Sequence, residues 1–401
     1  MSDGQSRLAA LGRAASDALE NDLLPFWHRM EDRAHGGHFA AMSHAGVLDR
    51  RAPKSTVFVA RILWTMSEAG RSLGSASSIE QARHAARFLL DRLRDRESGG
   101  FFWSVTHDGR PHETDKHLYA HAFAIYGLSA FAAATGSAEA HDVAAETFAL
   151  IEDRTRTARS GYREAFDRMW LATDNRRLAA GRGGGVRTMN SHLHLMEAYT
   201  ALAALTGAES HRAALADCLD LILRRFLAPG ATHAYAMLDD RLTPLPGPIS
   251  MGHDIETAWL IDAAADVIGD AALSERARSA SNALARNASE FGYCGARGFL
   301  TERAMDGTVD PWRVWWVQAE AVVGFVNAFQ RTGDEAMLAR AEILWDYIEG
   351  VMRDRRLGEW HWRVDAAGRP DPKKPKVEPW KEPYHQARAC LELMRRSGRI
   401  R

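Results

Sequence analysis

Six apolar stretches, each closed by a glycine, recur along the chain and constrain its fold more than any other feature. In the fourth, residues 251–269, apolar side chains return at steps of three and four, as they do on one face of a helix that ends at a glycine. The closing glycines, separated by 62, 71, 62, 64 and 65 residues, are Gly74, Gly136, Gly207, Gly269, Gly333 and Gly398. One such unit cannot bury its apolar face alone and must stack on its neighbours. The repeat therefore predicts one all-α toroid over residues 1–401.

The same helical level of these stretches is polar in nearly every copy. Thirteen residues before the closing glycines stand Arg61, Phe123, His194, Glu256, Glu320 and His385. One turn earlier, on the same face, four copies carry Tyr119, Asn190, Trp316 and Lys381. His253 lies three residues before Glu256, on the first turn of its helix. Solvated helix faces would explain one or two of these residues but not a shared level, so we expect six helix starts that converge on a common cleft.

Composition and charge argue against several classes of function. The 51 basic and 52 acidic side chains among 401 residues form no long blocks of one sign, so neither nucleic acid nor an anionic membrane is an expected partner. Cys218, Cys294 and Cys390 are odd in number and far apart, which predicts buried thiols of a reducing compartment. The N-terminus has no signal-like pattern, and no run approaches 18 apolar residues. We therefore expect a cytoplasmic protein.

Short segments with glycine lie between the helices. Glycine shortly before an aromatic residue recurs in residues 99–103, 161–162, 298–299 and 358–360. We interpret these as extended segments at one mouth of the toroid, whose aromatic rings either stack on a flat ligand or cap the core. Residues 181–185, rich in glycine, lack the GK[ST] ending of a phosphate loop, which favours a flexible lid or linker. The first thirty or so residues are expected to form an amphipathic helix that ends near Trp27.

Two histidine pairs are candidate metal ligands. His117 and His121 stand four residues apart, the spacing with which a helix can clasp an ion. No glutamate of an HExxH pattern lies between them and no third ligand is evident nearby, which favours ordinary helix histidines. On a helix His192 and His194 point in different directions, and only His194 is at the shared polar level. We therefore expect neither a metal nor a cofactor.

The residue types of the cleft suit proton transfer next to a sugar carbonyl. The unperturbed pKa of histidine lies near neutrality, so the histidines of the cleft can remove and return a proton at pH 7 without a cofactor. Arg61 and a further histidine would stabilise the charge that develops on an enediolate oxygen. Two alternatives stay open: a glycoside hydrolase with Glu256 and Glu320 as its paired carboxylates, and a catalytically silent sugar-binding protein.

Over nearly its whole length the chain resembles the N-acylglucosamine 2-epimerase superfamily, and within it the cellobiose 2-epimerase and mannose 2-epimerase branch. The resemblance rests on residues 24–27 (LPFW), 61–64 (RILW), 190–200, 252–256 (GHDIE), 315–321 and 380–392. It implies an (α/α)6 barrel of six helical hairpins with short extended segments at one mouth. It also implies epimerisation at C2 of a reducing-end sugar without a cofactor. We expect a monomer or homodimer whose substrate is a mono- or disaccharide. A related isomerase would instead return the proton to C1 and convert mannose to fructose.

The resemblance further implies roles for single residues. His253 and His385 would be the acid/base pair on opposite faces of C2, acting through a cis-enediolate, while His194 and Arg61 would steady the oxygens at C1 and C2. The residues that would orient, bind or stack on the sugar are Glu256, Glu320, Tyr119, Asn190, Trp316 and Trp380. The chain differs from the branch at His121 and Gln386, and both positions are expected to lie close to the site.

Overall fold

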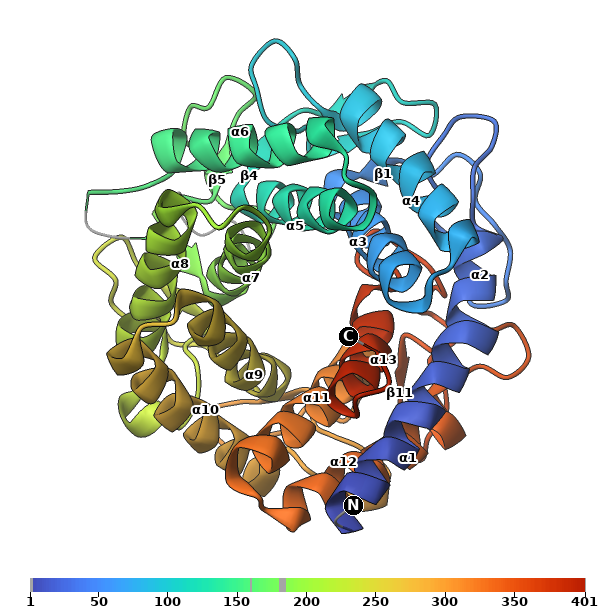
Figure 1. The fold of residues 1–401 in the computed structure, drawn as a ribbon, viewed down its shortest axis with the longest axis vertical. Helices are drawn as coiled ribbons and strands as arrows, with labels where there is room; N and C mark the ends of the chain where they lie inside the picture. The colour runs from blue at the N-terminus through green and yellow to red at the C-terminus, as the bar shows by residue number, and fades with distance from the viewer. Residues whose placement is uncertain (1–2, 159–160, 180–184, 401) are drawn as a thin grey trace.

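Six helices form the inner ring of the protein, as a computed structural model of residues 3–158, 161–179 and 185–400 shows (Figure 1). They are α3 (Thr56–Leu73), α5 (Leu118–Thr135), α7 (Met189–Thr206), α9 (Met251–Ile268), α11 (Trp315–Thr332) and α13 (Tyr384–Arg396). Each contacts the next, and α13 contacts α3, so the ring is closed. The first five end at the glycines that the repeat singled out, all left-handed with φ between 63° and 74°. The predicted inner helices are therefore confirmed.

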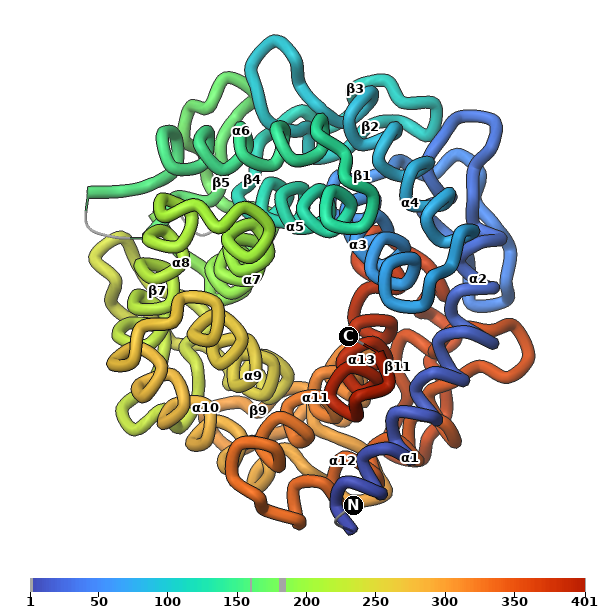
Figure 2. Tube along the Cα trace, viewed as in Figure 1, coloured from blue at the N-terminus to red at the C-terminus, as the bar shows by residue number. Residues whose placement is uncertain are grey.

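An outer layer of helices covers the inner ring. Each of five outer helices packs on the inner helix that precedes it: α4 (Ala76–Phe88), α6 (Ala138–Arg154), α8 (Glu209–Leu221), α10 (Ala271–Phe291) and α12 (Glu335–Tyr347). The sixth outer position is filled by α1 (Asp3–Ala18), which continues through a π-helical turn, Leu19–Leu23, into α2 (Leu24–His28). Because α1 packs on α13, the sixth pair joins the two ends of the chain (Figure 2). The (α/α)6 architecture is as expected, but only five of its pairs are hairpins in sequence.

Short turns of other helix types complete the outer layer. Three more π-helical turns end outer helices, at Leu89–Leu93, Ile222–Phe226 and Ile348–Met352, and 3-10 turns lie at Pro229–Ala231 and Gly295–Arg297.

Two-residue strands precede five of the inner helices. The antiparallel pairs are β1 (Lys54–Ser55) with β2 (Ser104–Val105), β4 (Lys116–His117) with β5 (Ala165–Phe166), β6 (Arg187–Thr188) with β7 (Met237–Leu238), β8 (Ile249–Ser250) with β9 (Glu302–Arg303), and β10 (Arg313–Val314) with β11 (Arg363–Val364). A further strand, β3 (Pro111–Glu113), pairs with β2. The first N–H of an inner helix donates to the next extended segment, as Leu118 does to Glu164 at 2.8 Å. The expected extended segments therefore lie at the N-terminal ends of the inner helices.

The aromatic residues that follow glycine in these segments belong to the core. Phe101, Tyr162, Phe299 and Trp360 are each at most 2% exposed. In three repeats, the inner-helix residue two positions before the polar level accepts a hydrogen bond from the backbone N–H of the aromatic residue. His121 Nε2 accepts from Phe101 (3.0 Å), His192 Nε2 from Tyr162 (3.2 Å), and Gln318 Oε1 from Phe299 (2.8 Å). Stacking of these four rings on a ligand is thus excluded, and the core interpretation holds.

This contact also corrects the expected position of His121. Its Nδ1 lies 2.8 Å from the His117 carbonyl oxygen while its Nε2 accepts from Phe101, so both ring nitrogens are engaged with backbone. Gln386 likewise turns away from the centre of the ring and donates to the Glu382 carbonyl at 2.9 Å. His117 caps α5 as its N-cap residue and does not share a helix with His121. Neither departure from the branch pattern faces the cavity described below.

Helix α5 has the most apolar composition of the inner ring. By length and composition alone this helix could cross a membrane, although the sequence predicted no apolar run of that length. However, 83% of the helix is buried inside the protein. Of the cysteines, Cys218 and Cys390 are buried as expected, whereas Cys294 is only half-buried; all three are free thiols. The lid or linker predicted at residues 181–185 falls outside the described residues except for Gly185.

Candidate active site

A cavity of about 190 Å³ opens at the N-terminal ends of the inner helices. Its lining residues are Arg61, Tyr119, Asn190, His194, His253, Glu256, Trp315, Trp316, Trp362, Trp380 and His385. Nine of the ten residues predicted for the site are among them, and the tenth, Glu320, lies directly behind His385. Lys381, which the repeat placed at the same level, instead pairs with Glu359 away from the cavity. The structure therefore brings the predicted residues together, with Lys381 as the exception.

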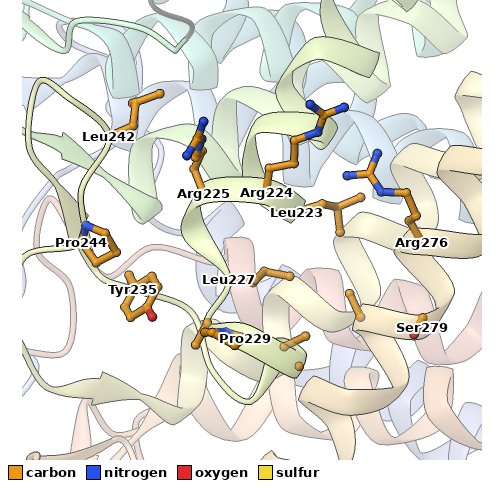
Figure 3. A pocket seen from close by; sticks show the side chains of 14 residues that line it. Leu223, Arg224, Arg225, Leu227, Pro229, Tyr235, Leu242, Pro244, Arg276 and Ser279 are labelled. Carbon is orange, nitrogen blue, oxygen red and sulfur yellow. The ribbon is translucent and has the colours of Figure 1, made fainter.

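Larger hollows exist elsewhere. One of about 350 Å³ shares Trp380 with the central cavity, and those of about 450, 610 and 830 Å³ contain none of these residues. One of about 610 Å³ lies on the outer layer, between the turn Ile222–Phe226 and α10. Figure 3 shows its arginines, Arg224, Arg225 and Arg276, along one side. Two of them pair with Asp220, so this surface is already partly neutralised. The small central cavity, which holds the titratable groups, is the candidate active site.

His385 is held by a carboxylate. Its Nδ1 lies 2.8 Å from Glu320 Oε1, and Glu320 Oε2 accepts from Trp259 Nε1 at 3.0 Å. Arg388, one turn along α13, donates from Nη2 to Glu320 Oε1 at 2.7 Å. Burial, together with the positive charges of Arg61 and Arg388, lowers the pKa of His385 well below its ordinary value. His385 is therefore a neutral, oriented imidazole with Nε2 left for a ligand.

His194 has a second carboxylate of the same kind. Its Nδ1 lies 2.9 Å from Glu197 Oε2, and the Tyr384 hydroxyl donates to the same oxygen at 2.5 Å. Glu197 also forms an ion pair with Arg388. Burial opposes ionisation of Glu197, yet Arg388 and His194 hold its pKa at about 2, while burial lowers the pKa of His194. The two histidine–carboxylate pairs thus meet at one guanidinium.

His253 has a more open environment than the other two histidines. Its ring packs on Trp316 with centroids 4.9 Å apart, and the same indole lies 5.4 Å from His385. Burial, reinforced by His194, lowers the pKa of His253 to about 4. Its side chain is half-buried. Two neutral imidazoles therefore flank one tryptophan, and each can accept a proton at neutral pH.

Arg61 is fixed from several sides. Its Nη1 donates to Glu382 at 2.5 Å and its Nη2 to the Tyr119 hydroxyl at 2.7 Å. The guanidinium lies over the Phe123 ring at 4.1 Å from the centroid. Burial, together with the nearby carboxylates, raises the pKa of Tyr119 to about 12, so that hydroxyl stays protonated. A fixed positive charge therefore lies at the wall of the cavity.

Two carboxylates and one histidine, at and directly behind the cavity wall, lie close enough together to suggest a cation site. Glu256, Glu320 and His385 place possible ligand atoms within 4.8 Å of one another. However, Arg388 Nη2 donates to both carboxylates, at 2.5 Å to Glu256 and 2.7 Å to Glu320. The guanidinium thus already supplies a positive charge to this group of ligands, and the chemistry available to the site is proton transfer by its own side chains.

Sequence reasoning missed the layer beneath the cavity. Glu197 and Arg388 each follow a predicted histidine by three residues, one turn deeper into the ring. The signal was present, because ten residues before the closing glycines stand Trp64, Tyr126, Glu197, Trp259, Val323 and Arg388. Extending the count by one turn would have found this second polar and aromatic level. Two further cavity residues were also missed: Trp315, the first residue of α11, and Trp362, just before β11. Their rings pack together with centroids 4.9 Å apart.

Comparisons with known proteins point to one family. The profile of N-acylglucosamine 2-epimerase (GlcNAc 2-epimerase) matches residues 37–389. A cellobiose 2-epimerase of Ruminococcus albus is 39% identical over 94% of this chain and 97% of that protein. The solved cellobiose 2-epimerase of Bacillus thermoamylovorans superposes with a TM-score of 0.92 at 34% identity, covering 96% of this chain and 99% of the other. A D-mannose isomerase of Thermobifida fusca is 27% identical over 90% of this chain and 89% of that protein.

Proposed function

The chain belongs to the N-acylglucosamine 2-epimerase family and is a sugar isomerase, and from this premise we propose that it epimerises C2 of cellobiose or free mannose. The observation that carries the proposal is the pair of oriented or stacked neutral imidazoles, His253 and His385, on either side of Trp316. Removal of a proton by one base and its return by another is what inversion at a carbon next to a carbonyl requires.

The proposed roles follow from the contacts of each side chain. One of His253 and His385 removes the C2 proton and the other delivers a proton to the opposite face of the cis-enediolate. Arg61, a fixed cation, and His194 stabilise the oxygens at C1 and C2 as negative charge develops. Glu320 orients His385 at 2.8 Å. Glu256 and the rim residues Tyr119, Asn190, Trp316 and Trp380 bind the sugar, whose apolar face suits indole rings.

The geometry disfavours one alternative activity, glycoside hydrolysis, and leaves the other, aldose–ketose isomerisation, as the second candidate. A hydrolase that uses Glu256 and Glu320 needs both carboxylates beside the scissile bond. Glu320 does not line the cavity, and both carboxylates accept from the same nitrogen of Arg388, which disfavours this alternative. An aldose–ketose isomerase would use the same bases and differ only in where the proton returns, and the D-mannose isomerase relative supports keeping it as the second candidate. A cytoplasmic location and a monomeric or homodimeric state stay predictions.

Proton NMR in deuterated water tests the proposal. The protein is incubated separately with mannose and with cellobiose, and the products and their deuterium content are read at C2. We expect glucose or glucosyl-mannose with deuterium at C2, and no exchange with His385→Asn. His121→Gln is the matched control, because it also replaces a buried histidine with an amide but lies off the cavity. Fructose would identify the isomerase instead, and no exchange with either sugar would overturn proton transfer as the mechanism.

A further inference from the structure

Three carboxylates share the guanidinium of Arg388. Its Nη2 donates to Glu256 Oε1 at 2.5 Å and to Glu320 Oε1 at 2.7 Å, and its Nη1 pairs with Glu197. None of these four residues is more than 4% exposed. If all three carboxylates were ionised, two negative charges would be left in excess among side chains that are almost fully buried. Arg61 does not offset them, because it already pairs with Glu382. Such an excess is relieved when one carboxylate takes up a proton.

The number of hydrogen-bond donors identifies which carboxylate that is. Glu197 accepts from His194 and Tyr384 in addition to Arg388, and Glu320 accepts from His385 and Trp259 in addition to Arg388. Each donor favours the ionised form. Glu256 accepts from Arg388 alone, and its Oε2 is buried without a partner among the described residues. A buried polar atom without a partner on a cavity wall points to a ligand that supplies one.

We propose that Glu256 is a neutral carboxylic acid whose Oε2 hydroxyl donates a hydrogen bond to a substrate oxygen in the cavity. The inference rests on the proposed function, because that reaction builds negative charge on the sugar oxygens. A neutral donor stabilises this charge, whereas a carboxylate at the same place would repel it. Burial, reinforced by Glu320, raises the pKa of Glu256 to about 8. The proton on Glu256 thus has two effects: it reduces the excess negative charge around Arg388, and it provides a hydrogen-bond donor for the substrate oxygen.

The groups around Glu256 determine how its titration can be recognised. The charged ones are Arg388 on α13, Glu197 on α7 and Glu320 on α11. The other titratable ones are His194, His253, His385, Tyr119 and Tyr384. Burial lowers the pKa of each of these histidines and raises the pKa of each tyrosine. The histidines therefore titrate below pH 8 and the tyrosines above it. Two nearby acids also have raised pKa values through burial: Asp254, two residues away on α9, at about 8, and Glu320. A loss of rate near pH 8 is therefore assigned to Glu256 by its disappearance in Glu256→Gln.

Two matched amide variants test the inference by kinetics. Glu256→Gln keeps a neutral donor on the cavity wall, so we expect kcat/KM at pH 7 to fall about tenfold or less and the alkaline decline near pH 8 to vanish. Glu320→Gln removes the negative charge that orients His385, so we expect a larger fall in kcat/KM. It also removes the charge that reinforces the raised pKa of Glu256, so the alkaline decline should remain but move to lower pH. The inference is overturned if Glu256→Gln loses as much activity as Glu320→Gln, or if it keeps the wild-type decline.

A spectroscopic readout makes the inference independent of turnover. Infrared spectra of protein labelled with ¹³C at the glutamate carboxyl distinguish the protonated acid from carboxylates. Because only glutamates carry the label, the spectra exclude the signal of Asp254, another buried acid whose pKa burial raises to about 8. We expect a protonated glutamate band at pH 7 that disappears as pH rises through about 8 and is missing from Glu256→Gln. Absence of any such band in the wild-type protein at pH 7 overturns the inference even if the variant fails to fold. A normal band with no turnover of any sugar would count against the proposed function alone.

Discussion

The inner helices α5 and α13 both border the cavity, but they contribute to it in opposite ways. Helix α5 is apolar along most of its length and offers the cavity one polar side chain, the Tyr119 hydroxyl. Residues 381–388, which lead into and begin α13, form ion pairs or hydrogen bonds with Glu359, Arg61, Glu197, Glu256 and Glu320. Four of these partners lie on α3, α7, α9 and α11, and Glu359 lies between the turn Ile348–Met352 and β11. The last helix and the segment before it therefore both close the ring and carry most of the ion pairs of the site, while α5 forms a mainly apolar wall.

The largest expected effect comes from Arg388→Met on the α13 side. The variant leaves three buried carboxylates without their shared cation, and breaking a buried ion pair costs about 3–5 kcal/mol in the free energy of unfolding. We also expect turnover to be lost, because both histidine–carboxylate pairs lose their common support. Urea unfolding and the NMR assay measure the two effects. Arg212→Met, at an exposed pair with Glu209, is the control and should change stability by less than about 1 kcal/mol. Equal losses in the two variants would contradict a central role for Arg388.

Glu382→Gln should rank second. It removes the charged partner of Arg61 while retaining an oxygen that can accept a hydrogen bond. A hydrogen bond between charged groups is worth about 1.5–3 kcal/mol, so kcat/KM should fall roughly 10- to 100-fold as Arg61 loses its fixed position. Steady-state kinetics measure this. Glu392→Gln is the control, because Glu392 lies within α13 and pairs with Arg395 and Arg396; it should leave the kinetics unchanged. Similar kinetics for both variants would show that α13 does not position Arg61.

Tyr119→Phe tests the α5 side and should have a smaller effect. The substitution keeps the ring but removes the hydroxyl that accepts from Arg61 at 2.7 Å. Arg61 retains Glu382, so we expect kcat/KM to fall about tenfold or less. The same kinetic assay measures it. A loss larger than that of Glu382→Gln would reverse this comparison of the two sides.

His121→Gln on α5 should have the smallest effect at pH 7. Gln318 makes the same backbone contact in another repeat, so the amide should hold the Phe101 N–H, whereas His121→Ala leaves that N–H without an acceptor at a cost of about 1–3 kcal/mol. Urea unfolding of both variants at pH 7 measures this difference. Equal stability of the two would show that the contact contributes nothing.

The same position predicts a dependence of stability on pH. Burial lowers the pKa of His121 to about 3 in the folded protein, below its ordinary value of 6.5. Between these values the unfolded chain binds the proton that the folded one does not, so the free energy of unfolding falls as pH drops below 6.5, by at most about 1.4 kcal/mol per pH unit from this group. His121→Gln should therefore lose less stability than the wild-type protein between pH 7 and pH 5. An unchanged slope would show that His121 is not buried in its neutral form.

Much of the site could be read from the sequence because its signals are local and periodic. The closing glycines mark a left-handed residue at each helix end, and counting back from them placed Arg61, His194, Glu256, Glu320 and His385 at one level. Helical spacing alone determines which residues share a face of a helix. The residues predicted to share a level therefore do lie at or directly behind the cavity wall in the structure. Within a repeat, local geometry is sufficient for such predictions.

Partner choice across the ring depended on the tertiary structure alone. The spacing of residues in the sequence does not show that Arg388 pairs with carboxylates from α7, α9 and α11, or that α1 completes the sixth helix pair with α13. Nor does it show that His121 turns outward to a backbone N–H while His194 turns inward. The sequence by itself determined the repeat, the helix ends and the level of the polar side chains. Which charges meet, and hence which carboxylate carries a proton, was decided only when the ring closed, because electrostatic interactions act over a few ångströms between residues far apart in the chain.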